Sequence, residues 1–288
     1  MTMMQRGVKS RQRRSLAPGA CVFGLFVVCA LPLQADTWLK DPITGCQVSS
    51  PESKPDSSEL VSWSGDCQDG KASGQGVLVW LEGGILQLRF EGPMVEGKTE
   101  GFGRVWLRGD SGYDHYEGQF KGSKLDGQGV YKDADGSRYE GEFRNDKPHG
   151  YGIYEGADGT RFAGELRNGE PNGEGFVSLP NGEKYRGGFK NGVRTAKGVL
   201  LLPKGERYEG EFQDGELHGH GVYSLVDGGV FEGQFRVGVP DGRGKYTAPN
   251  GDVAEGNVKD GKPDGKIIVT GADGTREEQF WKDGKRVE

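Results

Sequence analysis

Residues 138 to 159 read RYEGEFRNDKPHGYGIYEGADG, and this stretch decides the fold. From Arg138 to Phe143, apolar or small residues alternate with charged ones, which is the two-residue period of a strand with one buried face. A polar connection (144–149) and a second short strand (151–155) follow. The stretch closes on Asp158-Gly159, a pair typical of a tight turn in which both central residues have a positive φ. The sequence therefore predicts a β-hairpin.

The same unit recurs every 23 residues. Its aromatic residue stands at Tyr116, Tyr139, Phe162, Tyr185, Tyr208 and Phe231, and a Gly-x-Gly pair keeps the same register in most copies. Looser copies near Trp63 and Phe90 and decayed copies near Ala254 and Glu277 bring the total to about ten. A fixed period of this length indicates an array of stacked units. The predicted fold class is all-β: an elongated, single-layer, antiparallel β-hairpin solenoid of about ten repeats.

Glycine accounts for 53 of the 288 residues, against a usual share of about 7 %. Without a period, this composition and a mean hydropathy of -0.68 would favour disorder. In the repeat register, Gly141, Gly150 and Gly152 leave flat spaces beneath the rings of Tyr139 and Phe143. Rings that lie over bare backbone form a thin core with little side-chain volume.

The units resemble the MORN repeat family, whose pattern is an aromatic-x-Gly strand, a Gly-x-Gly strand and a closing Asp-Gly or Asn-Gly turn. Tyr139-Glu140-Gly141, Gly150-Tyr151-Gly152 and Asp158-Gly159 show it, and the resemblance covers roughly residues 62 to 286. It implies an elongated hairpin array used for scaffolding, protein association and, in some members, suspected membrane contact. It implies no active site. We expect residues 36–61 to form an N-terminal capping segment and residues 62–288 to form the repeat array.

Residues 1–35 have the features of an export signal. They hold five basic residues and no acidic one, followed by an apolar run from Ala20 to Leu33 and a small residue, Ala35, at the expected cleavage position. We predict cleavage near Ala35 and a periplasmic location, with an uncleaved anchor as the alternative. Cleavage would leave 32 basic residues against 43 acidic ones, a net charge of -11. This balance disfavours nucleic acid and anionic lipid as partners and favours a basic protein.

Cysteine usage points to the same compartment. Cys21 and Cys29 would leave with the signal, and Cys46 and Cys67 remain as an even pair in an exported chain. We predict a disulfide between them, with two free thiols as the alternative. Closing this loop would stabilise the fold by about 3 kcal/mol.

Motifs that suggest chemistry are better explained by the repeat. Gly109-Asp110-Ser111-Gly112, near His115, resembles the surroundings of a catalytic serine but falls at a turn between units. The glycine of Asp133-Ala134-Asp135-Gly136 comes too early for a calcium loop. His149 and His218 stand three units apart in one repeat column, and His218 with His220 lacks a third ligand. The sequence therefore predicts no catalytic, cofactor-binding or metal site.

Two columns of side chains are candidate binding surfaces. On the second strand, both faces are apolar: one carries Tyr131, Tyr154, Val177, Leu200, Tyr223, Tyr246 and Val269, and the other carries Val130, Ile153, Phe176, Val199, Val222 and Ile268. A single layer buries only one of them, so we expect an exposed apolar stripe, unless the ribbon curls or dimerises to bury both. A glutamate column points away from the aromatic face. The candidate partner-binding residues are Tyr131, Tyr154, Tyr223, Tyr246, Glu117, Glu140, Glu142, Glu209, Glu211 and Glu232.

Two departures from the repeat deserve separate mention. The segment Val193 to Gly198 departs from the usual polar-Gly-x-Gly connection. This departure would change the direction of the ribbon or mark a contact site. The first units contain Trp63, Trp80 and Trp106. We expect them to form a cap stapled by the disulfide, because the open end of a solenoid must be blunted; a tryptophan-rich contact site is the alternative.

These features lead to one expected function and one alternative. We expect a non-catalytic periplasmic scaffold that binds a protein, and more specifically an inhibitor or immunity protein that neutralises a secreted toxin acting on lipids or other phosphodiesters. The alternative is a membrane-associated or envelope-associated scaffold.

Overall fold

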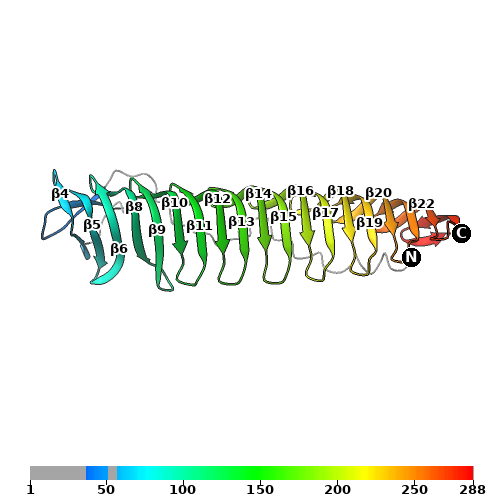
Figure 1. The fold of residues 1–288 in the computed structure, drawn as a ribbon, viewed down its shortest axis with the longest axis horizontal. Coiled ribbons are helices and arrows are strands. Elements are labelled where there is room, and N and C mark those ends of the chain that lie inside the picture. Colours follow the sequence, from blue (N-terminus) through cyan, green and yellow to red (C-terminus); the bar gives the residue numbers. More distant parts are fainter. Residues whose placement is uncertain (1–36, 51–56, 288) are drawn as a thin grey trace. The chain divides into compact units, whose positions relative to one another are not determined.

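The structure, a computed structural model, describes residues 37–50 and 57–287, so the predicted signal at 1–35 lies outside the described residues. All regular elements in these ranges are strands (Figure 1). No helix that could span a membrane occurs among them. The chain divides into two contact units, which we call the N-terminal unit (residues up to 170) and the C-terminal unit (171–287). The predicted all-β fold of antiparallel hairpins is confirmed.

In the N-terminal unit the strands are β1 (Thr37–Lys40), β2 (Gln47–Ser50), β3 (Glu59–Trp63), β4 (Asp66–Gln68), β5 (Lys71–Glu82), β6 (Ile85–Val95), β7 (Lys98–Thr99), β8 (Gly101–Arg108), β9 (Tyr113–Lys121), β10 (Lys124–Lys132), β11 (Arg138–Arg144), β12 (Lys147–Glu155) and β13 (Arg161–Arg167). From β8 to β13 each strand pairs antiparallel with the next. β5 pairs with β3, β4 and β6, and touches β2 through one parallel pair, Gln47 with Lys71.

The C-terminal unit contains β14 (Glu170–Ser178), β15 (Lys184–Lys190), β16 (Val193–Leu201), β17 (Arg207–Gln213), β18 (Glu216–Ser224), β19 (Val230–Arg236), β20 (Val239–Thr247), β21 (Val253–Lys259), β22 (Lys262–Thr270), β23 (Arg276–Lys282) and β24 (Lys285–Val287). Each pairs antiparallel with its neighbour in sequence. From β8 to β13 in the N-terminal unit, and throughout the C-terminal unit, the strands lie side by side in one row (Figure 1).

The core consists of aromatic rings laid over glycine. Tyr139 is fully buried, and a Cβ atom on Gly152 would lie 2.3 Å from its hydroxyl oxygen. The hydroxyl donates to the carbonyl of Glu142 at 3.0 Å. The ring meets Phe143 edge to face at a centroid distance of 5.0 Å, and Phe143 meets Tyr116 in the same way at 5.2 Å. The predicted role is confirmed for Gly141 and Gly152, which lie against Tyr139, but a Cβ atom on Gly150 would meet the carboxylate of Glu142 and not a ring. We call the face that carries these rings the inner face and the opposite one the outer face.

The turns differ from the prediction. At Asp158-Gly159 only the glycine has a positive φ (87°), within a longer loop closed by a hydrogen bond from the Gly156 nitrogen to the Thr160 oxygen at 2.8 Å. The two-residue turn with two positive φ values lies at the other end of the hairpin, for example at Asn168 (53°) and Gly169 (87°). Asparagine tolerates this conformation because its short polar side chain bonds locally. The second strand is therefore longer than predicted, and the predicted polar connection is a tight turn.

These two-residue turns are anchored to the preceding hairpin. The nitrogen of Gly169 donates to the carbonyl of Pro148 at 2.8 Å, and the nitrogen of Gly261 donates to that of Pro240 at the same distance. Proline suits the acceptor position because it lacks a backbone donor but keeps its carbonyl. The result is a ladder in which every rung joins neighbouring repeats.

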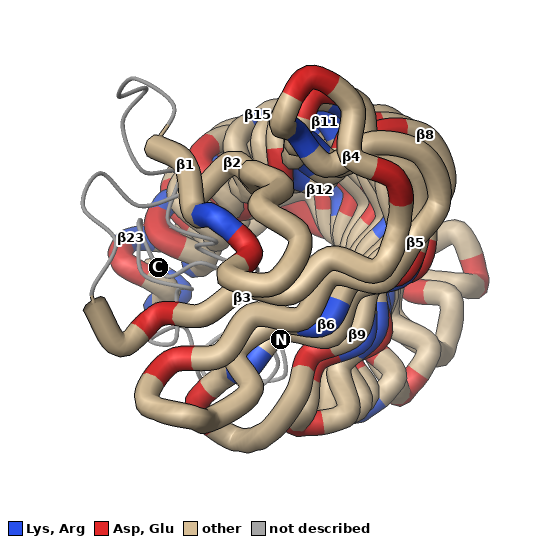
Figure 2. The backbone as a smooth tube through the Cα atoms, turned by 90° about the vertical axis from the view of Figure 1, so that its left-hand side faces the viewer, with Lys and Arg blue, Asp and Glu red and all other residues tan. Residues whose placement is uncertain are grey.

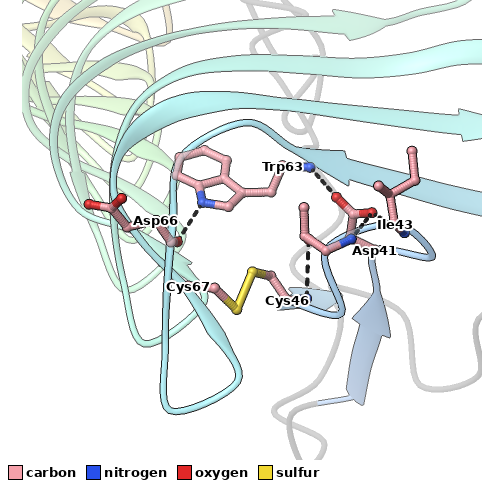
Figure 3. The surroundings of a disulfide bond; sticks show 7 residues. Asp41, Ile43, Cys46, Trp63, Asp66 and Cys67 are labelled. Atoms are coloured by element: carbon pink, nitrogen blue, oxygen red, sulfur yellow. Dashed lines mark hydrogen bonds between the residues drawn. A yellow bond between two sulfur atoms is a disulfide. The ribbon is translucent and has the colours of Figure 1, made fainter.

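A disulfide fastens the first strands to the array (Figure 3). It joins Cys46 to Cys67, as predicted. Beside it, the carboxylate of Asp41, 1 % exposed, accepts hydrogen bonds from the backbone nitrogens of Trp63 at 2.9 Å and Ile43 at 2.8 Å. Burial acts to raise the pKa of Asp41, but these backbone donors, with Thr44, outweigh it and hold the pKa below its usual value. The β1–β2 segment is thus held to the array by the disulfide and by the hydrogen bond from Trp63 to the buried carboxylate of Asp41.

Candidate protein-binding surface

The four candidate tyrosines lie on the inner face. Tyr131 is 3 % exposed and Tyr246 is 9 % exposed, and the hydroxyl of Tyr131 donates to Asp114 at 2.6 Å. Tyr154 and Tyr223 are half-buried on the same face, and burial, helped by the charge of Glu206, raises the pKa of Tyr223 to about 12. The structure corrects the prediction for Tyr131 and Tyr246, because these side chains fill the core and are not accessible to a partner.

The opposite apolar column faces outward. Val130 lies between Glu117 and Glu140 on the neighbouring strands, and Val222 lies between Glu209 and Glu232. Every member is half-buried: Val130, Ile153, Phe176, Val199, Val222 and Ile268. An outward apolar stripe therefore exists, but its side chains are half-buried and interrupted by carboxylates, and it belongs to the valine column and not to the tyrosine column.

Three of the candidate glutamates form ion pairs on the outer face. Glu140 pairs with Arg138, Glu209 with Arg207 at 2.5 Å and Glu117 with Arg104 at 3.0 Å. The side chains of Glu140 and Glu209 keep more than half of their surface exposed, at 54 % and 58 %. Glu232 is exposed as well. In Figure 2, further acidic residues recur at the loops that join the strands. Pairs this exposed contribute little to stability, so the glutamates remain accessible to a partner.

Glu142 and Glu211 have a local structural role that sequence reasoning missed. Each lies against the first glycine of a Gly-x-Gly pair, where the ladder register shifts. A Cβ atom on Gly150 would lie 2.2 Å from a carboxylate oxygen of Glu142, and one on Gly219 would lie 2.2 Å from that of Glu211. Gln119, at the equivalent place, accepts a hydrogen bond from the Gln128 nitrogen at 2.8 Å. These side chains cover the bulge.

The tryptophans divide between the two faces. Trp63 (1 % exposed) and Trp80 (8 %) point inward and support the cap, and the indole nitrogen of Trp63 donates to the Asp66 carbonyl at 2.9 Å. Trp106 points outward, with its ring 5.1 Å from that of His115 and 5.2 Å from the guanidinium of Arg89. Two outward aromatic side chains that the sequence analysis did not single out, Phe102 (59 % exposed) and Tyr151 (60 %), add to this face.

The altered segment at Val193 to Gly198 is explained by an internal contact. Arg194 stands where neighbouring repeats have Pro171 and Leu217. Its guanidinium lies 4.9 Å from the ring centroid of Tyr185 and pairs with Glu183 at 2.5 Å. The two charged side chains are only 12 % and 20 % exposed. The segment carries a largely buried ion pair within the fold.

The motifs with a resemblance to catalytic or metal sites occupy turns and strands of the repeat. The nitrogen of Gly109 donates to the Gly112 carbonyl at 2.7 Å, which closes a loop before β9. Ser137 donates its backbone N–H to Asp135 at 2.7 Å within the next loop. In the described ranges, no three His, Cys, Asp or Glu side chains converge as metal ligands would.

Comparison with known proteins identifies the repeat. The family model for the MORN repeat matches residues 64–85, 116–138, 139–161, 162–184, 185–207, 208–230, 231–253 and 255–276. No curated protein matches the chain.

Similar solved structures are distant. The SAS-4 TCP domain of Drosophila melanogaster, in complex with a proline-rich motif of Ana2, is 13 % identical with a TM-score of 0.30, over 63 % of this chain and 85 % of that one. A virginiamycin B lyase from Staphylococcus aureus is 14 % identical with a TM-score of 0.15, over 61 % and 68 %. A streptogramin B lyase is 14 % identical with a TM-score of 0.16, over 80 % and 85 %. Scores this low support no statement about this chain.

Proposed function

The chain belongs to the MORN repeat family, and on that premise we propose that it is a non-catalytic scaffold that binds a protein through its outer face. The division between the two faces supports this most directly. The inner face is occupied by the chain's own rings, with Tyr116, Tyr139, Tyr185 and Tyr208 all fully buried. The outer face presents half-buried aliphatic side chains beside exposed glutamates over successive strands. Apolar surface that is bordered by polar residues often marks an interaction site, since protein interfaces have an apolar core and a polar rim.

We further propose that the scaffold acts in the periplasm as an inhibitor or immunity protein. The predicted signal at 1–35 and the disulfide both favour an oxidising compartment outside the cytoplasm. An enzyme that binds phosphate groups needs Arg or Lys in its active site. A chain with a net charge of -11 after cleavage is suited to cover such a site, so the partner would be a secreted toxin that acts on lipids or other phosphodiesters.

The alternative is a scaffold associated with the membrane or envelope. The same net charge opposes binding to anionic lipid. Sedimentation with vesicles that contain anionic lipid separates the two: binding at physiological ionic strength would support the alternative, and no binding would support the protein-binding proposal.

Capture from a periplasmic extract tests the main proposal. The purified protein serves as bait, and the activity of the captured partner is then measured with and without the bait. We expect a basic partner whose activity falls when the bait is present. An unaffected activity would remove the inhibitor role and leave the scaffold role.

Two variants, one that removes charge and one that reverses it, test whether the glutamate column contacts the partner. Replacing Glu140 and Glu232 together by Gln removes two charges with little change of shape, and replacing both by Lys reverses them. A basic partner should bind the Gln variant more weakly than the unaltered protein and the Lys variant more weakly still, because surface charges act mainly through long-range attraction. Equal binding by all three proteins would exclude the glutamate column as the contact.

A further inference from the structure

The outer face of the N-terminal unit carries an aliphatic patch on β3, β5 and β6. In β5, Val77, Val79 and Leu81 follow one another on the outer face, while Leu78 and Trp80 between them point inward with exposures of 3 % and 8 %. Leu81 pairs across the ladder with Leu60 on one side and with Leu86 on the other. The aliphatic patch is Leu60, Val77, Val79, Leu81 and Leu86, of which Leu60 is 51 % exposed and the others are half-buried.

The repeat does not require this patch. In β10, the outward residues are Gln128, Val130 and Lys132, and in β20 they are Arg243, Lys245 and Thr247. Polar residues with at most one apolar residue among them are thus sufficient to keep a second strand in the array. Three successive outward aliphatic residues in β5 leave an apolar surface that is only half-buried, and such a surface indicates an interface.

Charges of both signs border the aliphatic patch in equal number. Arg89 and Glu91 are consecutive outward residues of β6 and form an ion pair, with side chains 41 % and 33 % exposed. They lie across the ladder from Val79 and Val77. The guanidinium of Arg89 also lies over the ring of Trp106. A partner with one dominant sign of charge would meet one attractive and one repulsive group here.

We propose that the aliphatic patch is the contact between two copies of this chain, related by a two-fold axis that sets β5 against β5. A two-fold interface must be complementary to itself. The patch satisfies this condition about an axis that crosses β5 at Leu78, because Val77 of each copy then meets Val79 of the other while Arg89 of each copy faces Glu91 of the other. Two sheet faces of this kind pack about 10 Å apart with interdigitated side chains. The dimer is independent of the proposed binding of a foreign protein, which uses the glutamate column.

Apolar contact must overcome the repulsion between two acidic chains. Each copy carries a net charge of -11 after cleavage, and salt screens this repulsion. Salt also screens the attraction between Arg89 and Glu91 across the axis, so the apolar residues and the charged pair are tested separately below.

Sedimentation velocity of the purified protein over a range of concentrations tests the proposal. We expect a dimer whose dissociation constant rises at least about tenfold in Val79→Glu. Val222→Glu is the matched control, since it also replaces a half-buried outward valine by a carboxylate, and it should leave the dimer intact. Circular dichroism checks that both variants fold. A monomer at every concentration, or a dimer that Val79→Glu does not weaken, would overturn the proposal.

Charge exchange gives a second test that does not depend on the apolar residues. Arg89→Glu and Glu91→Arg should each weaken self-association, because like charges then face one another across the two-fold axis. A mixture of the two variants should form a mixed dimer, and the double exchange within one chain should restore the original dissociation constant. Mixed variants that stay monomeric while the unaltered protein is dimeric would show that Arg89 and Glu91 do not meet.

Discussion

Gly188 in β15 and Ala196 in β16 reverse the usual arrangement of the repeat, in which the first strand carries the side chain and the second strand has glycine. In the hairpin of β11 and β12 the same positions hold Glu142 and Gly150, and the carboxylate of Glu142 fills the space where a Cβ atom of Gly150 would lie. In the hairpin of β15 and β16 the side chain is on the other partner, and a Cβ atom on Gly188 would lie 3.5 Å from that of Ala196. Ala196 retains the positive φ of the bulge, at 56°. The two positions adjoin one volume, and in neither hairpin do both of them carry a side chain.

This relationship predicts a rescue by a second substitution. Gly150→Ala should lower the free energy of unfolding by about 1 to 3 kcal/mol, because it places a Cβ atom against Glu142 and an L-residue at a φ of 58°. Adding Glu142→Gly removes the clash and should recover part of the loss. Urea denaturation of the two single variants and the double variant measures the coupling. Strictly additive losses would contradict the idea of a shared volume.

Val237 is held in an unfavourable backbone conformation. It is the first residue of a two-residue turn with a φ of 48°, where the equivalent residues are Asn191, Asp214 and Asp260, and its side chain is 62 % exposed. A β-branched residue rarely adopts this conformation. Val237→Asn should raise the free energy of unfolding by about 1 kcal/mol, measured as a higher melting temperature. Val237→Ala serves as the control, because it keeps the positive φ without the polar side chain. A lower melting temperature for Val237→Asn would mean that the valine makes a stabilising contact.

Reduction of the disulfide should loosen the cap. Replacing Cys46 and Cys67 by Ala removes the link between β2 and β4 and should cost about 3 kcal/mol. Hydrogen exchange locates the effect: the amide of Trp63, which donates to Asp41, should exchange faster in the variant. Amides of distant strands such as β20 should keep their rates, because each hairpin contacts its neighbours only. Equal acceleration throughout the chain would show that the array unfolds as a whole.

The cap should also weaken in acid. The pKa of Asp41 is lower in the folded chain than its usual value, since backbone donors favour the carboxylate over the opposing effect of burial. The stabilisation is therefore present above the unfolded pKa of about 3.9 and is lost as the pH falls through the lower folded value. Exchange of the Trp63 amide, corrected for its intrinsic rate, should accelerate over this acidic range. Asp41→Asn should abolish this step, and a step that persists in that variant would assign it to another carboxyl group.

The sequence specifies the core of this fold more completely than its turns. The fit between Tyr139 and Gly152 follows from the spacing of the two residues in a paired register. Asp158-Gly159 and Asn168-Gly169 are both short turn-forming pairs, so residue type alone does not separate the tight turn from the longer loop. What distinguishes them is the hydrogen bond between Gly156 and Thr160, which belongs to a longer loop.

The residues of the second strand also do not determine by themselves which face of that strand points inward. Tyr131 and Val130 are both apolar, so alternation alone could not decide which points inward. The ladder decides it, because Tyr131 pairs with Tyr139 and therefore shares its face. The packing of Glu142 against Gly150 could have been found in the sequence, since an acidic or amide residue stands eight positions before most of the bulge glycines.

The ladder of glycine nitrogens and proline carbonyls has a consequence for how such a chain changes over generations. Gly169 is held by Pro148 and Gly261 by Pro240, each one hairpin away, so a hairpin needs only its two neighbours as a template. An in-frame duplication or deletion of 23 codons would leave all the remaining hydrogen bonds between neighbouring hairpins intact. Array length can thus vary in whole hairpins, while the residues that shape each surface vary independently by point mutation.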